Sequence, residues 1–124
     1  MQASGYLTRP DYRVDLLRRL NRVTASAGGT KLASSRNAIF VDEQDHGLVV
    51  YFPRHDVDLR ALVAVPRHAT FCPYKGEASY WALATAPEKP IGWSYEQPFP
   101  EVAGIAGYVA FYQNLVEVSL GGTD

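Results

Sequence analysis

Short apolar runs separated by polar, glycine-containing segments make up most of the chain, and this pattern is typical of β-strands and turns. Residues 39–41 and 48–52 are β-branched and aromatic runs, and the polar segment between them ends in Gly47. Two such runs predict a hairpin with a longer loop. Pro53 then ends the second strand, because proline has no N–H to donate to the ladder.

The segment from residue 12 to residue 23 has two interpretations. Its valines and leucines recur at nearly helical spacing, which favours a helix if periodicity alone decides. The alternative is a short strand at 12–17 and a second strand at 22–27. Gly28-Gly29 supports the strands, because glycine adopts the positive φ angles of a tight hairpin turn that would lead into residues 30–35.

The remaining elements complete a mainly β domain. Pro100 opens a segment that suits one short helix near residues 100–106, since proline is accepted in the first turn. Residues 59–65 fit a helical turn or a strand equally well. Further strands and a turn are expected at 69–72, 77–85, 86–90, 108–112 and 116–120. We expect a single compact domain of about eight short antiparallel strands over residues 12–124, preceded by an extended or poorly ordered segment at 1–11.

Length and charge narrow the classes of function. With 124 residues the chain is expected to form one domain, and its 12 basic and 13 acidic residues leave a net charge of −1. This balance does not favour a nucleic-acid partner, because such proteins usually carry a basic surface. The sequence has no apolar run near the ~18 residues that a membrane-spanning helix needs, and its N-terminus lacks the pattern of a secretory signal.

The single cysteine bears on location and on metals. It excludes a disulfide within the chain and a four-thiolate zinc site, and it favours a reducing cytoplasm. His68 precedes Cys72 by four residues, which on a strand separates the two by about 13 Å. We therefore expect neither a metal site nor a bound cofactor.

The segment around Cys72 combines the most varied chemistry in the chain. Pro73 and Gly76 predict a four-residue hairpin loop, because proline presets φ and glycine supplies a left-handed residue. With that loop, Cys72 and Glu77 form the closing pair, and alternation places a thiol, a carboxylate, two hydroxyls and an indole on one face. These residues are Thr70, Cys72, Glu77, Ser79 and Trp81. Lys75 lies on the loop and could lean over that face.

This face of the hairpin has two interpretations. The first is the wall of a ligand pocket. The second is a purely structural hairpin, in which Cys72 is a small buried apolar residue and Lys75 pairs weakly with Glu77 at the surface. The residue types alone favour neither interpretation.

Three residues from other segments are further candidates for such a pocket. Trp93 and Tyr95 share a face if their segment is extended, and with Trp81 they could form an aromatic cage. Arg54 follows a strand end, where functional residues often lie, although a local pair with Asp56 is the alternative. The candidate ligand-binding residues are Arg54, Thr70, Cys72, Lys75, Glu77, Ser79, Trp81, Trp93 and Tyr95.

Several sequence blocks, taken in order, resemble the family named domain of unknown function 427. The blocks are Tyr51-Phe52-Pro53-Arg54 with Asp56-Val57, Cys72-Pro73-Tyr74-Lys75-Gly76 with Tyr80-Trp81, Trp93-Ser94-Tyr95, Pro98-Phe99-Pro100-Glu101-Val102, and Gly107-Tyr108-Val109-Ala110-Phe111-Tyr112. The resemblance covers residues 12–118 and implies a compact, mostly β fold similar to the Mss4-like or β-tent group. Related chains carry proline near the positions of Arg18 and Leu20, which argues against a continuous helix, although this chain, lacking those prolines, could still form a helical turn.

The resemblance leaves the function open. Relatives in the fold group often hold zinc with paired CxxC motifs, which this chain lacks, so no metal is implied. The family also bears a nucleotidyltransferase label, but the chain has no glycine-rich phosphate loop to support it. We expect a small cytosolic domain that binds a small molecule in a pocket around the hairpin of residues 72–81. The alternatives are an enzyme that uses Cys72, Lys75 or Glu77, and an interaction module that presents the aromatic-rich C-terminal third.

Overall fold

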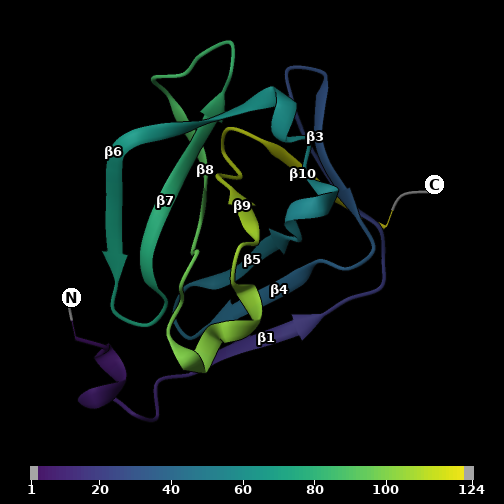
Figure 1. Cartoon of the computed structure of the whole chain (residues 1–124). Helices are drawn as coiled ribbons and strands as arrows, with labels where there is room; N and C mark the ends of the chain where they lie inside the picture. The colour runs from purple at the N-terminus through teal and green to yellow at the C-terminus, as the bar shows by residue number, and fades with distance from the viewer. Residues whose placement is uncertain (1–2, 122–124) are drawn as a thin grey trace.

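The structure, a computed structural model, describes residues 3–121 and contains two antiparallel sheets (Figure 1). The larger sheet has seven strands in the order β1-β4-β5-β9-β8-β7-β6, and the smaller has three in the order β10-β2-β3. The strands are β1 (Val14–Arg18), β2 (Val23–Ala27), β3 (Thr30–Ser35), β4 (Ile39–Glu43), β5 (Gly47–Phe52), β6 (Leu62–Cys72), β7 (Gly76–Leu83), β8 (Pro90–Ser94), β9 (Val109–Phe111) and β10 (Glu117–Leu120). The helical segments in this part of the chain are the 3-10 turns η1 (Gly5–Leu7), η2 (Arg54–Asp56), η3 (Leu59–Ala61) and η4 (Pro100–Ile105). The prediction of a mainly β single domain is confirmed, and the segment near residues 100–106 that was expected as a short helix is the 3-10 segment η4.

The N-terminal third forms strands, so the helical interpretation of residues 12–23 is wrong. β1 pairs with β4, and β2 pairs with β3 through a turn at Gly28-Gly29, where the two φ angles are +56° and +82°. These angles explain the two glycines, because residues with a Cβ rarely adopt them. The helical spacing misleads because two of its leucines are not core residues: Leu17 and Leu20 are 37% and 72% exposed.

Two clusters of buried residues lie on opposite faces of the larger sheet. The first lies between the two sheets and includes Leu32 from the smaller sheet with Phe52 and Phe111 from the larger. The second lies on the other face, where Val102 and Ile105 of η4 pack against strand residues. η4 covers only one end of that face (Figure 1) and leaves the rest of the face open.

The other predicted elements are largely present. The β4–β5 hairpin and the closing strands β9 and β10 match their predictions, although the β4–β5 loop is shorter than expected because β4 extends to Glu43 and β5 begins at Gly47. Residues 59–65 combine both interpretations: η3 is followed directly by the start of β6. β8 is an additional strand, which brings the strands in the described residues to ten.

The register of the β6–β7 hairpin differs from the prediction. Cys72 pairs with Gly76 and Phe71 pairs with Glu77, so the loop has three residues rather than four. A shift of one residue moves every side chain of one strand to the other face. Cys72 and Glu77 therefore lie on opposite faces, and the predicted pocket that joined them is not formed.

Gly76 closes this shorter loop as the partner of Cys72. It has a φ of +117°, and a Cβ at this position would lie 3.4 Å from the carbonyl oxygen of Gln97. The N–H of Phe99 donates a hydrogen bond of 3.0 Å to the carbonyl of Lys75. The positive φ is the reason for glycine at this position, and the segment at 97–99, which is distant in the sequence, packs against it.

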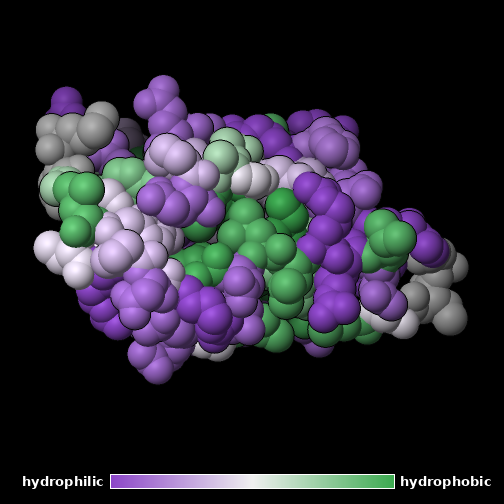
Figure 2. Space-filling model, turned by 90° about the horizontal axis from the view of Figure 1, so that it is seen from below, coloured by the Kyte–Doolittle hydropathy of each residue, from purple (hydrophilic) through white to green (hydrophobic). Residues whose placement is uncertain are grey.

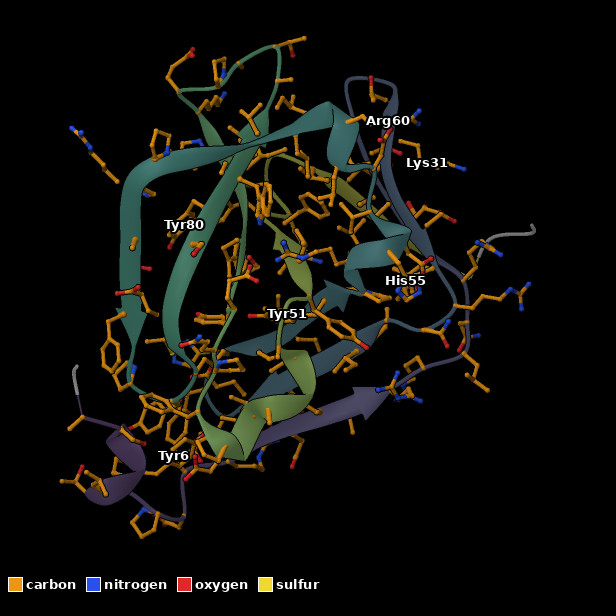
Figure 3. All side chains as sticks on the ribbon, in the orientation of Figure 1. Tyr6, Lys31, Tyr51, His55, Arg60 and Tyr80 are labelled. Carbon is orange, nitrogen blue, oxygen red and sulfur yellow. The ribbon has the colours of Figure 1, made fainter. Side chains whose placement is uncertain are left out.

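The N-terminal lead-in is a packed turn over its described residues, not an extended or poorly ordered segment. Tyr6 is 9% exposed and lies beneath the tip of the β6–β7 hairpin (Figure 3). Its ring meets the ring of Tyr74 edge-on at 5.3 Å, and Tyr12 stacks on the other side of Tyr74 at 3.6 Å. Residues 1, 2 and 122–124, which belong to the predicted segments 1–11 and 12–124, lie outside the described residues.

The face formed by β1 and η4 has an apolar centre with a hydrophilic border (Figure 2). On β1, Val14 and Leu16 are half-buried and pack against the second cluster. Within residues 3–121, none of the helical segments has the length and apolar character required to cross a membrane.

Candidate functional site

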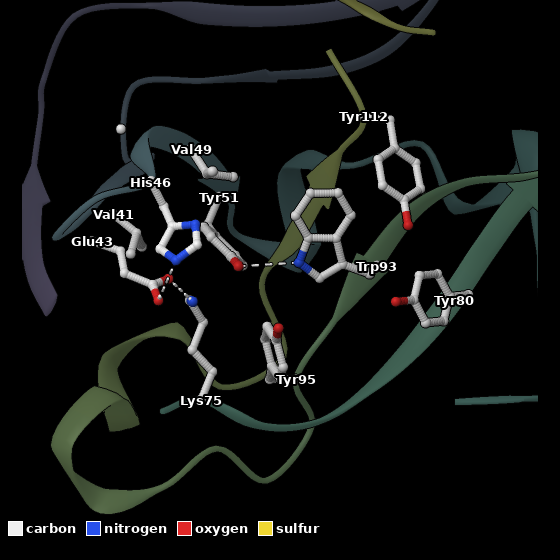
Figure 4. A pocket seen from close by; sticks show the side chains of 11 residues that line it. Val41, Glu43, His46, Val49, Tyr51, Lys75, Tyr80, Trp93, Tyr95 and Tyr112 are labelled. Carbon is white, nitrogen blue, oxygen red and sulfur yellow. Dashed lines mark hydrogen bonds and ion pairs between the residues drawn. The ribbon is translucent and has the colours of Figure 1, made fainter. Parts of the chain in front are cut away.

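The open part of the larger sheet contains a cavity of about 330 Å³ (Figure 4). Strands β4, β5, β7 and β8 contribute side chains to it, and the β4–β5 turn and the β6–β7 loop border it. One end is polar and the remainder is largely aromatic. The polar residues are Glu43, His46 and Lys75, and the aromatic ones are Tyr51, Tyr80, Trp93, Tyr95 and Tyr112.

Strand alternation directs these side chains to one face. Trp93 of β8 pairs with Tyr80 of β7 on one side and with Ala110 of β9 on the other. Ala110 pairs in turn with Tyr51 of β5. Because paired residues in neighbouring strands point to the same face, Tyr80, Trp93 and Tyr51 share one face, with the small Ala110 on the strand between Trp93 and Tyr51.

The polar end is a buried ion pair between Lys75 and Glu43. The side chains of the two residues are 10% and 11% exposed, and the ammonium of Lys75 donates to the carboxylate of Glu43. The hydroxyl of Tyr12 donates to the second carboxylate oxygen at 2.6 Å, while Lys75 Nζ also lies 3.8 Å from Cys72 Sγ. A buried charge is stable only with such partners, so the N-terminal segment helps to hold this end of the cavity.

These partners set the ionisation of Glu43. Burial by itself raises the pKa of the carboxyl group, but the hydrogen bonds from Lys75 and Tyr12 and the charge of Lys75 outweigh burial. The pKa of Glu43 therefore lies below its usual value, and the carboxylate is charged at neutral pH. His46, at the rim, adds a smaller effect in the same direction.

The aromatic wall is held by hydrogen bonds between its own members. Trp93 Nε1 donates to the hydroxyl of Tyr51 at 3.1 Å, and the Trp93 ring lies 4.9 Å from the ring of Tyr112. The hydroxyls of Tyr80 and Thr70 are 2.7 Å apart. These contacts fix the ring orientations before any ligand arrives.

Tyr95 is the exception in this wall. It is 7% exposed, yet its hydroxyl has no hydrogen-bond partner among the described residues. Figure 4 shows the hydroxyl directed into the space between Lys75 and Trp93. Burial raises the pKa of Tyr95 well above its usual value, so the group stays neutral and can both donate and accept a hydrogen bond.

Arg54 lies on the other side of the larger sheet and joins a separate cluster. It donates to the carbonyl of Gly107 at 2.9 Å and forms an ion pair with Glu96, while its guanidinium lies 5.3 Å from the Trp81 ring centroid. Trp81 Nε1 and the hydroxyl of Ser94 are 3.1 Å apart. The suggested local pair of Arg54 with Asp56 is not formed, because Asp56 instead accepts a hydrogen bond from Ser35.

Glu77 and Ser79 border a cleft on this second side. The cleft has a volume of about 550 Å³, and Phe71 and Phe99 form its apolar part. Glu96 also lines it, so the cleft adjoins the cluster around Arg54.

The predicted binding residues thus divide between two faces of the hairpin. Thr70, Cys72, Lys75, Trp93 and Tyr95 lie on the side of the aromatic cavity, and Arg54, Glu77, Ser79 and Trp81 lie on the other side. The cage of Trp81 with Trp93 and Tyr95 is not formed, because Trp93 pairs with Tyr80 and therefore points away from Trp81.

Eight residues that line the aromatic cavity are absent from the predicted set. They are Val41, Glu43, His46, Gly47, Val49, Tyr51, Tyr80 and Tyr112. Glu43 was assigned to a polar loop, although alternation from Val41 would have placed it on the face of its strand that carries apolar residues. Tyr51, Tyr80 and Tyr112 stand in the sequence blocks that carry the family resemblance, which is the signal that could have found them.

Comparison with known proteins bears on the family but not on the activity. A family model described as "Domain of unknown function (DUF427)" matches residues 5–122. The chain belongs to this family. A search of curated proteins found no match for the chain. Membership in the DUF427 family confirms the resemblance seen in the sequence blocks, while the grouping with Mss4-like or β-tent folds stays a prediction.

A metal ion has few ligands available in this DUF427 domain. Within residues 3–121, the structure has no group of three or more histidine, cysteine, aspartate or glutamate side chains placed to hold one. Glu43 is already paired with Lys75 and Tyr12, so its oxygens are occupied.

Proposed function

We propose that the aromatic cavity binds a small, flat organic molecule that carries a hydrogen-bond acceptor. The observation that carries this proposal is the hydroxyl of Tyr95, which has no partner among the described residues and is directed into the cavity. No buried side-chain oxygen or nitrogen of the described residues lacks a partner, so this hydroxyl is in reach of water, and a ligand acceptor that replaces the water gains about 0.5–1.5 kcal/mol.

The size and walls of the cavity support a flat ligand. Its volume of about 330 Å³ is at the lower end of the range for small-molecule sites, which suits a molecule of one or two rings. Trp93, Tyr51 and Tyr112 present aromatic surface, and stacked or edge-to-face contacts between rings stabilise beyond area burial alone.

Lys75 supports an acceptor on the ligand. Its ammonium has three donors, and its described partners are the carboxylate of Glu43 and, weakly, the sulfur of Cys72. One donor therefore remains for a carbonyl or similar group in the cavity. Because Glu43 compensates the charge of Lys75, the cavity favours an uncharged acceptor over a fully charged anion.

The alternative functions have less support. Cys72 packs in the cluster behind the cavity wall, and Lys75 is engaged in an ion pair, so neither is presented as a free nucleophile. Tyr95 and Phe111 of the aromatic C-terminal third are buried, which leaves less of that third for a protein partner.

We also propose a cytoplasmic location, because the chain has a single cysteine and a reducing compartment does not support disulfides.

Chemical-shift titration of the two indole N–H signals would test binding. Benzamide and 1-naphthamide should shift the signal of Trp93 and leave that of Trp81, which lies on the opposite side of β7, unchanged. Cyclohexanecarboxamide, which has the same acceptor without the aromatic ring, should bind more weakly. Tyr95→Phe should weaken benzamide binding by roughly 2- to 10-fold, the value of one neutral hydrogen bond.

Tyr108→Phe is the matched control, because Tyr108 is half-buried near the same cluster without lining the cavity. The proposal is wrong if both amides leave the Trp93 signal unmoved, or if Tyr95→Phe binds benzamide as tightly as the unmodified protein.

A further inference from the structure

Strand β1 lies at one edge of the larger sheet and pairs with β4 alone. Two backbone hydrogen bonds at its ends show which of its residues face β4. The N–H of Arg19 donates to the carbonyl of Ala38, and the N–H of Gln44 donates to the carbonyl of Arg13. Because the backbone direction alternates along a strand, the odd-numbered residues of β1 bond to β4 and the even-numbered residues point the other way.

The even-numbered residues of β1 form a row of free backbone groups. Val14, Leu16 and Arg18 direct their N–H and C=O groups away from β4, and within the described part of the chain these groups have no hydrogen-bond partner. A row of this kind is a template for a further strand.

The opposite edge of the sheet, on β6, is built differently. Pro66 has no N–H, Arg67 has a φ of +59°, and the register with β7 shifts between Ala64 and Ala69. Proline and bulges of this kind prevent an edge strand from pairing with another chain. β1 has neither feature, since its five residues pair with β4 in one uninterrupted register.

β1 is complementary to a second copy of itself. In an antiparallel pair centred on Leu17, Asp15 of each copy stands across from Arg19 of the other. Leu17, which is 37% exposed, meets its own counterpart at the twofold axis. The odd-numbered residues are the non-hydrogen-bonded positions of this pair, where side chains across the strands come closest. Two opposite-charge pairs therefore flank one apolar contact.

The charges select this register over its neighbour. A pair centred on Leu16 would place Asp15 across from Leu17 and give the carboxylate no cation. Arg19 has no ion pair within residues 3–121, so it is available to a second copy. Asp15 pairs with Arg13, but the two side chains are 54% and 47% exposed, which leaves the carboxylate accessible to a second cation.

The other face of β1 adds apolar contacts in the same register. Leu20 is 72% exposed, and continuing the register places it across from Val14 of the second copy. Val14 and Leu16 lie on the face of β1 that packs against the second cluster, beside the apolar centre seen in Figure 2. A second copy would extend this apolar surface and cover Leu20.

We propose that the domain forms a symmetric dimer in which β1 pairs antiparallel with β1 of a second copy, centred on Leu17. The two larger sheets then join edge to edge through isologous contacts. The occupant is a second copy because the order of charges along β1 complements its own reversal. Association is reversible, since one short strand forms the contact. β1 contributes no residue to the aromatic cavity, so the dimer does not depend on the proposed ligand.

Sedimentation velocity over a range of protein concentrations tests the proposal. The unmodified protein should shift from monomer to dimer as the concentration rises. Asp15→Arg places an arginine across from Arg19 of the second copy, and Arg19→Asp places an aspartate across from Asp15. Either change should raise the dissociation constant of the dimer about tenfold or more, because two opposite-charge pairs become like-charge pairs.

A mixture of these two variants provides the sharpest result. In the mixed dimer both charge pairs are again of opposite sign, so the mixture should dimerise as tightly as the unmodified protein. Arg67→Asp is the matched control, because it makes the same change of charge at an exposed position on the other edge of the sheet. It should leave the dissociation constant unchanged.

Backbone amide exchange supplies an independent measurement and a test of folding. The amides of Leu16 and Arg18 should exchange more slowly as the protein concentration rises, because they become bonded to the second copy. The amide of Leu17 faces β4 and should exchange slowly at every concentration. Slow exchange of Leu17 in Asp15→Arg and Arg19→Asp would show that the variants remain folded.

Three results overturn the proposal. A monomer at every concentration would leave the β1 edge to water or to a different protein. A dimer that persists in Asp15→Arg would lie at another surface, for example around the exposed Leu48 and Leu120. A mixture of the two variants that stays monomeric, although Leu17 exchanges slowly in both, would rule out the register centred on Leu17.

Discussion

Two ion pairs join distant segments of this domain, and they differ in their exposure to water. The side chains of Lys75 and Glu43 are 10% and 11% exposed, whereas those of Arg54 and Glu96 are 35% and 48% exposed. One pair borders the aromatic cavity, and the other belongs to the cluster beside the cleft.

The difference in exposure determines what each pair does for the fold. Water can replace a lost partner at Arg54 or Glu96, so an exposed pair contributes at most about 1 kcal/mol. Water does not reach a buried charge easily, so the loss of one partner leaves the other uncompensated. The Lys75–Glu43 pair therefore has the larger structural role of the two.

Removal of Lys75 should have the largest effect. Lys75→Met keeps most of the length of the side chain, being one heavy atom shorter, but leaves Glu43 buried with Tyr12 as its remaining strong partner. We expect the free energy of unfolding, measured by urea denaturation, to fall by about 3–5 kcal/mol.

The double variant Lys75→Met/Glu43→Gln separates the pair from the packing. Glutamine is neutral and still accepts the Tyr12 hydrogen bond, so the double variant should recover roughly 1–3 kcal/mol relative to additive losses. Additive losses would show that the two charges do not interact, and the comparison between the two pairs would then fail.

Acidification should have a smaller effect through the same pair. Because the pKa of Glu43 is lower in the folded state than its unfolded value of about 4.3, its stabilisation is complete above that pH. The stabilisation is then lost as the pH falls through the folded pKa. The loss should be smaller than for Lys75→Met, since a protonated carboxyl group keeps hydrogen bonds.

The measurement is the unfolding free energy against pH between neutral pH and the acid limit of folding. Glu43→Gln should flatten the acid side of this curve, while the exposed substitution Glu88→Gln should leave its shape unchanged. An identical curve for Glu43→Gln would show that Glu43 is not held by Lys75 and Tyr12.

Substitution in the exposed pair should have the smallest effect. Glu96→Gln keeps the hydrogen-bond acceptor for Arg54 and Ser94, so the free energy of unfolding should change by less than about 1 kcal/mol in urea denaturation. A loss as large as that of Lys75→Met would mean that exposure does not separate the two pairs.

In the β6–β7 hairpin, local sequence rules predict the turn and the strands but not the number of residues in the loop. Proline and glycine correctly predict a turn after Cys72, and the flanking residues correctly predict two strands. The number of loop residues follows from the pairing of Cys72 with Gly76, whose φ of +117° favours glycine, and the segment at 97–99 packs against this glycine. The register that results decides which side chains share a face, and with it which residues lie on each side of the hairpin.

The sequence by itself determined the elements whose causes are local. The paired glycines at residues 28 and 29 require a turn with positive φ, and the β-branched runs at 39–41 and 48–52 favour strands on backbone grounds. The sequence blocks that resemble the DUF427 family could likewise be recognised without the structure.

Only the tertiary structure determined which residue forms the ion pair with Lys75. One of the two interpretations of the sequence pairs Lys75 with Glu77, two residues away, but Lys75 reaches Glu43 on a strand 32 residues earlier, and Tyr12 completes the pair from the N-terminal segment. The physical reason is that a buried charge must find its partner in space, and which residues meet there depends on sheet order and register, which no single segment encodes.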